Sequence, residues 1–247
     1  MSTPTPAPVP APPAPVPAPS GDVPSNDKPK TDKPKTIGGA VIELLAGVES
    51  IIKKMGISSV GENAVSNNGG LWIGEDSPWK SVFTNDANRD LVLFCWKANG
   101  FSGMSLNVNK PAISVGLKPG QKVTVSFAEG VPSACAHAFE DTTLAIFGGL
   151  FQTWSEYTFG PQGAFDVSRN VNMKGNPVSM KGSKCTSDMN TCVFHCQDQN
   201  APSCETGYAL AGMDAPGCGG GYDPVMQGVG GGCSMGHDGE TVQVTFT

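Results

Sequence analysis

The sequence predicts an all-β protein, a β-sandwich with a disulfide-rich loop lobe, preceded by a disordered Pro-rich tail and one amphipathic helix. From residue 57 on, short runs rich in β-branched and aromatic residues alternate with turns that contain glycine, proline or asparagine. Most of the cysteines follow residue 184, in a glycine-rich stretch without clear periodicity. The first 36 residues are low in complexity and cannot bury a core.

Residues 1–36 predict the tail. They contain an imperfect Pro-Ala-Val repeat, APVPAPPAPVPAP, and a repeated DKPKT. Such a composition favours polyproline II and acts as a semi-rigid spacer. Serine and threonine beside the prolines suit O-linked sugar, and a plain disordered tail is the alternative.

Residues 37–56 predict the amphipathic helix. Apolar residues recur at helical spacing from Val41 to Met55, while glutamates and lysines fall on the other faces. Gly56 is suited to end the helix. Because the polar face is not strongly basic, a helix that packs against the domain or frays is favoured over one that contacts a membrane or a partner.

Residues 57–247 predict the sandwich domain. Lys118-Pro119-Gly120-Gln121 suits a tight turn, with proline second and glycine third. Val123, Val125 and Phe127 then alternate with polar residues, as in a half-exposed strand. The predicted strands are residues 71–74, 81–85, 90–96, 121–130, 143–149, 155–159, 164–173 and 241–247.

The cysteines predict disulfides that staple a lobe, residues 185–235, with little core of its own. A zinc site of Cys185, Cys192, Cys196 and Cys204 beside His195 is the alternative. Only Cys192 and Cys196 approach the spacing of structural zinc sites, so no metal is expected. The predicted disulfide cysteines are Cys95, Cys135, Cys185, Cys192, Cys196, Cys204, Cys218 and Cys233.

Disulfides indicate an extracellular protein. Met1, however, leads directly into STPTPAPVPAP, which has neither the basic start nor the apolar segment of a secretory signal. We favour a signal that is not part of this sequence. A cytosolic protein with free thiols is the alternative.

Composition argues against several classes of function. Charged residues make up 15% of the chain and the formal net charge is −6, so no basic footprint for nucleic acid exists. No apolar run is long enough to predict a membrane span. The glycine-rich run 219–232 lacks the lysine of a phosphate loop, and no G-x-S-x-G occurs, so no cofactor or nucleophilic serine is expected.

Glu156 and Asp166 are the candidate catalytic carboxylates. They lie ten residues apart on two predicted strands that antiparallel pairing would bring together. Glycoside hydrolysis uses two carboxyl groups, about 5 to 5.5 Å apart for retention or about 6.5 to 9.5 Å for inversion. The pKa of one group must be raised so that it stays protonated. Any two acids that face each other in a hairpin can lie this close together, so the pattern is not specific to catalysis.

Trp154, Glu156 and Asp166 are the candidate ligand-binding residues. Trp154 and Glu156 are two residues apart and face the same side of a strand, while Tyr157 faces the other. Carboxylates accept hydrogen bonds from sugar hydroxyls, and an aromatic ring packs on the apolar face of a sugar. Burial of Trp154 in the core is the alternative, and Trp96 is expected in the core.

Five segments resemble the thaumatin-like protein family, most closely small secreted fungal members that are thaumatin-like or effector-like. The resemblance is strongest over residues 145–195 and looser over 70–247. Family members carry a Glu-containing strand, an Asp-Val-Ser strand, an Asn-Pro segment, a Cys-Thr loop and a similar closing strand. The matching segments here are SEYT (155–158), FDVS (165–168), NPVSM (176–180), CTSD (185–188) and VQVTF (242–246).

The resemblance implies a flattened sandwich with a disulfide-rich lobe and, between them, an acidic cleft that is the family's proposed carbohydrate site. The family cleft holds one arginine, one glutamate and three aspartates. Glu156 matches the glutamate and Asp166 the first aspartate. The arginine position is Gly149.

Further departures leave the cleft at best half retained. The second aspartate falls on Val171, with Asn172 nearby, and Asp214 is a weak candidate for the third. The chain also has eight cysteines where family members often have ten or sixteen, and it lacks the family's terminal Cys-Pro.

We therefore predict a secreted fungal protein that binds cell-wall polysaccharide of the β-glucan type or a host target. The first alternative is a weak endo-β-1,3-glucanase, a glycoside hydrolase that uses Glu156 and Asp166. The second is an effector or antigen that acts through a protein-binding surface, with the cleft vestigial. Catalysis is the less favoured hypothesis, because the chain lacks several of the charged residues of the family cleft.

Overall fold

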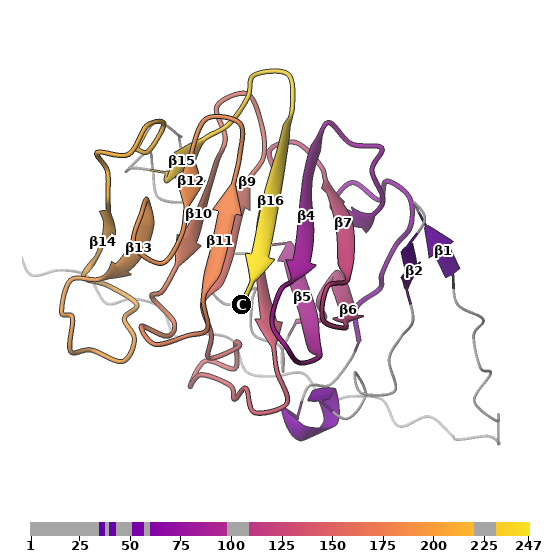
Figure 1. Cartoon of the computed structure of the whole chain (residues 1–247), viewed down its shortest axis with the longest axis horizontal. Coiled ribbons are helices and arrows are strands. Elements are labelled where there is room, and N and C mark those ends of the chain that lie inside the picture. The colour runs from indigo at the N-terminus through magenta and orange to yellow at the C-terminus, as the bar shows by residue number, and fades with distance from the viewer. Residues whose placement is uncertain (1–34, 38–39, 43–50, 57–59, 98–108, 220–230) are drawn as a thin grey trace, which may run out of the picture. The chain divides into compact units, whose positions relative to one another are not determined.

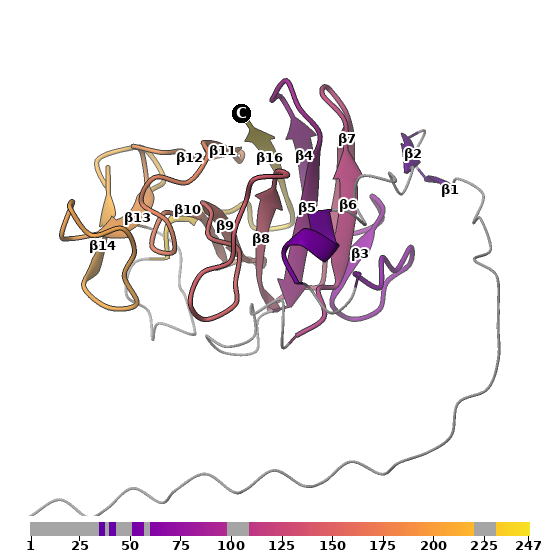
Figure 2. The ribbon, with the colours of Figure 1, turned by 90° about the horizontal axis from the view of Figure 1, so that it is seen from below.

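Two β-sheets face each other in the structure, a computed structural model that describes residues 35–37, 40–42, 51–56, 60–97, 109–219 and 231–247 (Figure 1). All of these residues belong to one compact unit, residues 34–247. Within the described residues one sheet has six strands and the other eight. Figure 2 shows the two layers edge-on.

The smaller sheet is built around the C-terminal strand. β16 pairs in parallel with β4 and antiparallel with β11, so the end of the chain lies in the middle of this sheet. Buried and less buried residues alternate along β4 and β16, which gives this sheet one face toward the core. The strand order is β12 (Thr186–Ser187), β11 (Val178–Lys181), β16 (Glu240–Phe246), β4 (Trp79–Asn85), β7 (Lys122–Phe127) and β3 (Leu71–Ile73).

The larger sheet continues into the Cys-rich lobe. β13 joins β10 in parallel, and β14 then pairs antiparallel with β13. The short strand β15 (Cys233–Ser234) also pairs with β10. The strand order is β14 (Tyr208–Ala211), β13 (Val193–Cys196), β10 (Ala164–Ser168), β9 (Trp154–Thr158), β8 (Pro132–Ala138), β5 (Leu91–Lys97) and β6 (Ile113–Leu117).

The part of the larger sheet around β5 is buried on both faces. Leu91, Leu93 and Cys95 point into the inner core between the two sheets. The alternate residues, Val92, Phe94 and Trp96, belong to a second cluster on the outer face of the same sheet. Residues 51–54 are helical and lie against this outer face, where Ile51, Ile52 and Met55 join the cluster (Figure 2). We call the second cluster the outer core.

The described end of the predicted amphipathic helix, residues 51–56, packs on the domain, but its beginning is not helical. Ala40–Ile42 is strand β2, which pairs antiparallel with β1 (Lys35–Ile37). The prediction of helix for residues 40–42, and of a tail for residues 35 and 36, is therefore wrong. The run Thr-Ile-Gly-Gly-Ala-Val carries a hairpin signal, Gly-Gly between two short runs that contain β-branched residues, and the helical spacing obscured it. Residues 1–34 and 43–50 lie outside the described residues.

Two other local predictions have clear outcomes. The turn at 118–121 is confirmed, since the Gln121 N–H donates to the Lys118 carbonyl at 2.9 Å and Gly120 has a φ of 78°. The strand predicted at 143–149 is wrong, because only an isolated bridge between Leu144 and Leu150 forms there. In the part of the chain that the structure describes, no helix is long and apolar enough to cross a bilayer.

Candidate functional site

Glu156 and Asp166 lie directly opposite each other on neighbouring strands. β9 and β10 pair antiparallel with Glu156 in register with Asp166. Residues that face each other in this way have Cβ atoms about 4.5 to 5.5 Å apart and project from the same face of the sheet. The structure therefore brings the two predicted carboxylates together, and we call them the carboxylate pair.

The carboxylate pair belongs to the outer face of the larger sheet. Ala134, which is the partner of Glu156 on β8, is part of the outer core, as is Trp154 on β9. Tyr157 lies in the inner core, where burial raises the pKa of its phenol. Trp154 and Tyr157 therefore face opposite sides of the strand, as predicted.

Asp166 is buried and Glu156 is partly exposed. Asp166 occupies the point on β10 at which the neighbouring strand changes from β15 to β13. The backbone of Gly232 approaches it so closely that a Cβ on Gly232 would lie 2.7 Å from the Asp166 Cβ. The pair therefore sits at the junction of the sandwich and the Cys-rich lobe, with the partly exposed glutamate as its accessible member.

One hydroxyl stabilises the edge of β10 at this junction. The Val167 N–H donates to Ser187 Oγ at 2.7 Å, and the Ser187 hydroxyl donates to the Cys192 carbonyl at 2.7 Å. Ser187 thus satisfies a strand N–H beside Asp166 and links β10 to the lobe.

Trp154 is a core residue in this structure. Its ring lies 5.3 Å from that of Trp96, and its indole N–H donates to the Leu150 carbonyl at 3.0 Å. Both tryptophans are fully buried, as expected for Trp96. Trp154 therefore presents no ring face to a ligand. The alternative, burial of Trp154 in the core, is the one observed.

The remaining positions that match the family cleft have local structural roles. At Gly149, a Cβ would lie 2.3 Å from the Phe147 ring, so no larger side chain fits without moving that ring. Asn172 donates to the Phe151 carbonyl at 3.1 Å and accepts the Lys174 N–H. Val171 packs against the outer core, and Asp214 is exposed on a turn of the lobe.

Sequence reasoning missed two charged residues with defined contacts. The Arg169 guanidinium donates to the carbonyls of Met173 and Met189, and so connects the end of β10 to the lobe. The buried Glu240 carboxylate accepts from Ser183 N–H, Ser183 hydroxyl and Gly236 N–H at 2.9, 2.7 and 2.8 Å. Arg169 directly follows β10 and Glu240 is the first residue of β16. These positions at strand ends are the sequence signal that could have indicated anchoring roles.

Glu240 also borders an open pocket of about 490 Å³. Its carboxylate is engaged by three donors from the loops that it joins, so it anchors those loops. The pocket is lined by Pro78, Lys181, Gly182, Ser183, Gly239, Glu240, Thr241 and Gln243.

All eight cysteines form disulfides, as predicted. The zinc alternative is wrong, since Cys185, Cys192, Cys196 and Cys204 each have a disulfide partner. The pairs are Cys95–Cys135, Cys185–Cys233, Cys192–Cys218 and Cys196–Cys204.

Comparison with known proteins places more than half of the chain in one family. Residues 75–226 match the model of the Allergen Asp f 4-like domain. None of the curated proteins matches the sequence significantly.

The solved structures that are similar to the chain include an inhibitor and an elicitor. One is the thaumatin-like xylanase inhibitor TLXI, with 12% identity, a TM-score of 0.36, and coverage of 67% of this chain and 97% of the inhibitor. The other is the protein elicitor MoHrip2 from Magnaporthe oryzae, with 14% identity, a TM-score of 0.34, and coverage of 68% of this chain and 98% of the elicitor.

Proposed function

The chain belongs to the Asp f 4-like allergen family, and within that family we propose that it is a secreted protein that binds cell-wall polysaccharide of the β-glucan type without hydrolysing it. Glu156 and Asp166 contact the ligand. The observation that carries this proposal is the cross-strand register of the two carboxylates. The four disulfides support an extracellular location, because such bonds persist in oxidising compartments.

Polyol binding suits the chemistry of this pair. An ionised carboxylate accepts hydrogen bonds through both oxygens, and a polysaccharide presents a dense array of hydroxyl donors. Backbone pairing holds Glu156 and Asp166 on two strands of an eight-stranded sheet, so little conformational freedom is lost on binding. The ligand contacts the partly exposed Glu156 first, because Asp166 beside it is buried.

Two features of this chain favour binding without catalysis. The Phe147 ring fills the space beside Gly149, the position that carries an arginine in thaumatin-like proteins. Trp154 is buried, so it offers no platform to distort a sugar ring. Hydrolysis needs one carboxyl group held protonated and a second held ionised, together with groups that position the substrate.

The direct test is a pull-down on insoluble β-1,3-glucan with wild type, Glu156→Gln and Asp166→Asn. Loss of one charge-assisted hydrogen bond weakens binding by about ten- to a hundredfold. Glu205→Gln makes the same chemical change at an exposed position of the lobe and should bind like wild type. Wild-type binding that both substitutions leave unchanged would remove the carboxylate pair from the proposal.

Hydrolysis is the second candidate, because the register of Glu156 with Asp166 places two carboxylic acids side by side, and retaining glycosidases use two carboxyl groups about 5 to 5.5 Å apart. The same samples are assayed for reducing-sugar release. Product from wild type, absent with Glu156→Gln and Asp166→Asn, would make the protein a glycoside hydrolase.

A protein-binding surface is the third candidate, and one exposed residue favours it. Ile146 is fully solvent-exposed at the tip of the bridged loop between Leu144 and Leu150. If folded wild-type protein neither binds nor cleaves β-glucan, the favoured hypothesis becomes binding of a host protein through this loop. Ile146→Ser is then the variant that should lose the target.

A further inference from the structure

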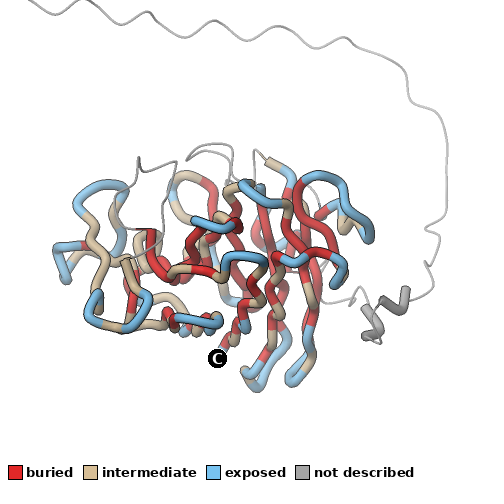
Figure 3. Tube along the Cα trace, turned by 90° about the horizontal axis from the view of Figure 1, so that it is seen from above, coloured by how far each residue is buried: buried red, intermediate tan, exposed pale blue. Residues whose placement is uncertain are grey.

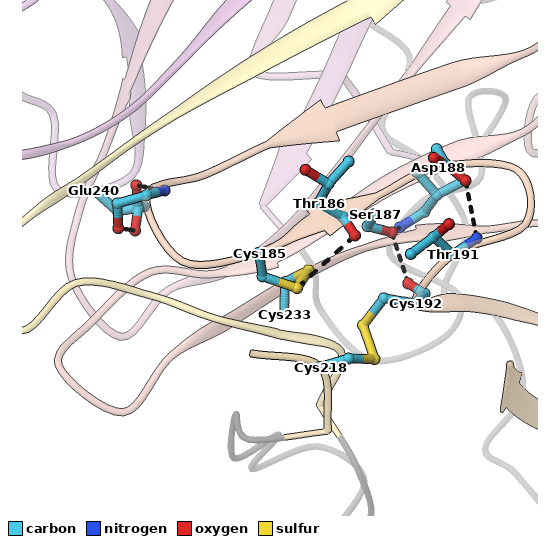
Figure 4. Close-up of a disulfide and its surroundings, with 11 residues drawn as sticks. Cys185, Thr186, Ser187, Asp188, Thr191, Cys192, Cys218, Cys233 and Glu240 are labelled. Atoms are coloured by element: carbon cyan, nitrogen blue, oxygen red, sulfur yellow. Dashed lines mark hydrogen bonds between the residues drawn. A yellow bond between two sulfur atoms is a disulfide. The ribbon is translucent and has the colours of Figure 1, made fainter. Parts of the chain in front are cut away.

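Four of the eight cysteines meet at one place in the lobe. The Sγ atoms of Cys185, Cys192 and Cys233 all lie within 4.8 Å of one another, although Cys185 is bonded to Cys233 and Cys192 to Cys218. Figure 4 shows the two disulfides beside each other. The Cys192 sulfur is therefore close to a disulfide of which it is not a part.

Cys218 and Cys233 are also neighbours through their backbones. They form an antiparallel bridge, in which Gly219 N–H donates to the Gly232 carbonyl at 2.7 Å and Ser234 N–H donates to the Gly217 carbonyl at 2.9 Å. The chain already contains a disulfide between such neighbours. Cys95 and Cys135 pair across β5 and β8 in register and are bonded, with their Cα atoms 4.1 Å apart.

We propose that Cys185, Cys192, Cys218 and Cys233 form a thiol-exchange site that has two pairings and reacts with small thiols. The first pairing is the one observed, Cys185–Cys233 with Cys192–Cys218. The second joins Cys185 to Cys192 and Cys218 to Cys233. We call these residues the cysteine quartet.

The small thiol enters at Cys218. Cys218 is only partly buried, whereas the other three cysteines of the quartet are buried. Gly217 sets this position. It has a φ of 77°, and a Cβ there would lie 2.8 Å from the Lys184 carbonyl oxygen and 3.1 Å from the Cys185 Cβ. The backbone before Cys218 thus lies directly against Cys185.

Each exchange step is a displacement at sulfur. The thiolate of a small thiol such as glutathione attacks Cys218 Sγ, the Cys192–Cys218 bond breaks, and its electron pair stays on Cys192 Sγ. The Cys192 thiolate attacks Cys185 Sγ and releases the Cys233 thiolate. The Cys233 thiolate then attacks Cys218 Sγ and expels the small thiol. Two disulfides are present before and after, and the small thiol is regenerated, so no oxidant or reductant is consumed.

The observed pairing remains the major one. It is the pairing that the structure shows, with Cys185 bonded to Cys233 and Cys192 bonded to Cys218. The exchange site is confined to the lobe, because no third cysteine belongs to such a group with Cys95–Cys135 or Cys196–Cys204 in the described residues.

The first experiment is the single variant Cys218→Ser, which leaves Cys192 as a thiol beside the Cys185–Cys233 disulfide. Free thiols are alkylated without reductant after acid quenching, and the labelled position is mapped. We expect label on Cys192 and also on Cys185 or Cys233, cysteines that remain bonded and unlabelled in wild type. In the matched control, Cys204→Ser, the label should stay on Cys196. Label confined to Cys192 in folded Cys218→Ser would overturn the proposal.

The second experiment uses the wild-type chain and holds even if Cys218→Ser does not fold. The protein is incubated in a glutathione buffer, quenched in acid and cleaved with cyanogen bromide after methionine. Met189, Met213, Met226 and neighbouring methionines separate the quartet into four fragments, residues 181–189, 190–213, 214–226 and 227–235.

The fragment links identify each pairing. The observed pairing links 181–189 to 227–235 and 190–213 to 214–226. We expect a new minor species that links 181–189 to 190–213 and 214–226 to 227–235, together with glutathione on fragment 214–226. Absence of these species contradicts the proposal. New links to Cys95 or Cys135 would also contradict it, since they would show that exchange follows general unfolding.

Discussion

The sandwich and the Cys-rich lobe are stabilised by different interactions. In the sandwich, side chains such as Phe83, Val125 and Phe165 are completely buried, and the sheets make a continuous apolar core. In the lobe, every residue of β14 is only half-buried. Figure 3 shows the same contrast, with buried residues along the central strands and half-buried or exposed ones around β13 and β14.

Covalent and polar links replace apolar burial in the lobe. Three of the four disulfides have both cysteines between residues 185 and 233. The Asp188 carboxylate accepts the N–H groups of Asn190 and Thr191, and Ser187 bridges β10 to Cys192. A segment that cannot bury enough apolar surface is thus held by cross-links and by side chains that satisfy its backbone. The four predictions below test this difference.

The largest effect is expected in the sandwich. Phe127 is fully buried, with its ring 5.2 Å from that of Tyr157 and 4.7 Å from that of Phe159. Phe127→Ala should lower the free energy of unfolding by about 3 to 5 kcal/mol. Phe194→Ala, in the half-buried lobe strand β13, should lower it by about 1 kcal/mol. Denaturant unfolding measures both, and equal losses would contradict the contrast.

Removing disulfides should affect the lobe according to loop length. Cys185→Ser with Cys233→Ser opens a cross-link between residues 48 apart, whereas Cys196→Ser with Cys204→Ser opens one between residues 8 apart. Loop-closure entropy predicts losses of roughly 4 and roughly 2.5 kcal/mol. Thermal unfolding of the two double variants ranks them, and the reverse order would show that native contacts outweigh chain entropy.

A third prediction concerns pH and belongs to the sandwich. His137 lies in the inner core, with its ring 4.4 Å from that of Phe246 and 5.0 Å from that of Phe139. Among the described residues neither ring nitrogen has a hydrogen-bond partner. Burial, assisted by the Arg89 charge that lies over Phe139, lowers the pKa of His137 to about 3.

Between pH 6.5 and 3 the unfolded chain therefore binds a proton at His137 that the folded chain does not. The free energy of unfolding is therefore not reduced by His137 above pH 6.5, and it decreases as the pH falls toward 3. At pH 4.5 the loss should be roughly 2 to 3 kcal/mol. His137→Leu should flatten this part of the stability profile, whereas the exposed His237→Leu should retain it. Parallel profiles for the two variants would exclude His137 as the cause.

The smallest effect is expected at an exposed apolar residue. Ile146 is fully exposed, so Ile146→Ser should change the free energy of unfolding by no more than about 0.5 kcal/mol. Calorimetry at neutral pH is sufficient. A larger loss would mean that Ile146 contributes to the core, and it would remove the loop from consideration as a protein-binding surface.

Local pattern was sufficient for part of the fold. The turn at Gly120 and the alternating strands that became β7 and β16 were predictable, because each depends on residues adjacent in the chain. By contrast, β8, with the sequence PSACAHA, has weak strand propensity and was not predicted. Its alanines are required by their neighbours, since Ala134 and Ala136 lie between the bulky rings on β5 and the residues of β9.

Some features of the candidate site also follow from local sequence, and others depend on tertiary structure. The sequence by itself determined that Trp154 and Tyr157 face opposite sides of a strand, and it favoured disulfides over free thiols or zinc. It also indicated that antiparallel pairing could bring Glu156 and Asp166 together, as the structure shows. Only the tertiary structure decided that Trp154 is buried, because the outer core to which it belongs includes Ile51, Ile52 and Met55, which are distant in sequence.

The cysteine pairing was likewise decided by tertiary structure. Cys218 and Cys233 flank a short glycine-rich segment, yet each is bonded to a different cysteine while their backbones pair. Side-chain type and spacing act locally and can be read from the sequence. Burial and cross-linking depend on which distant segments pack together, and that is settled only when the whole chain folds.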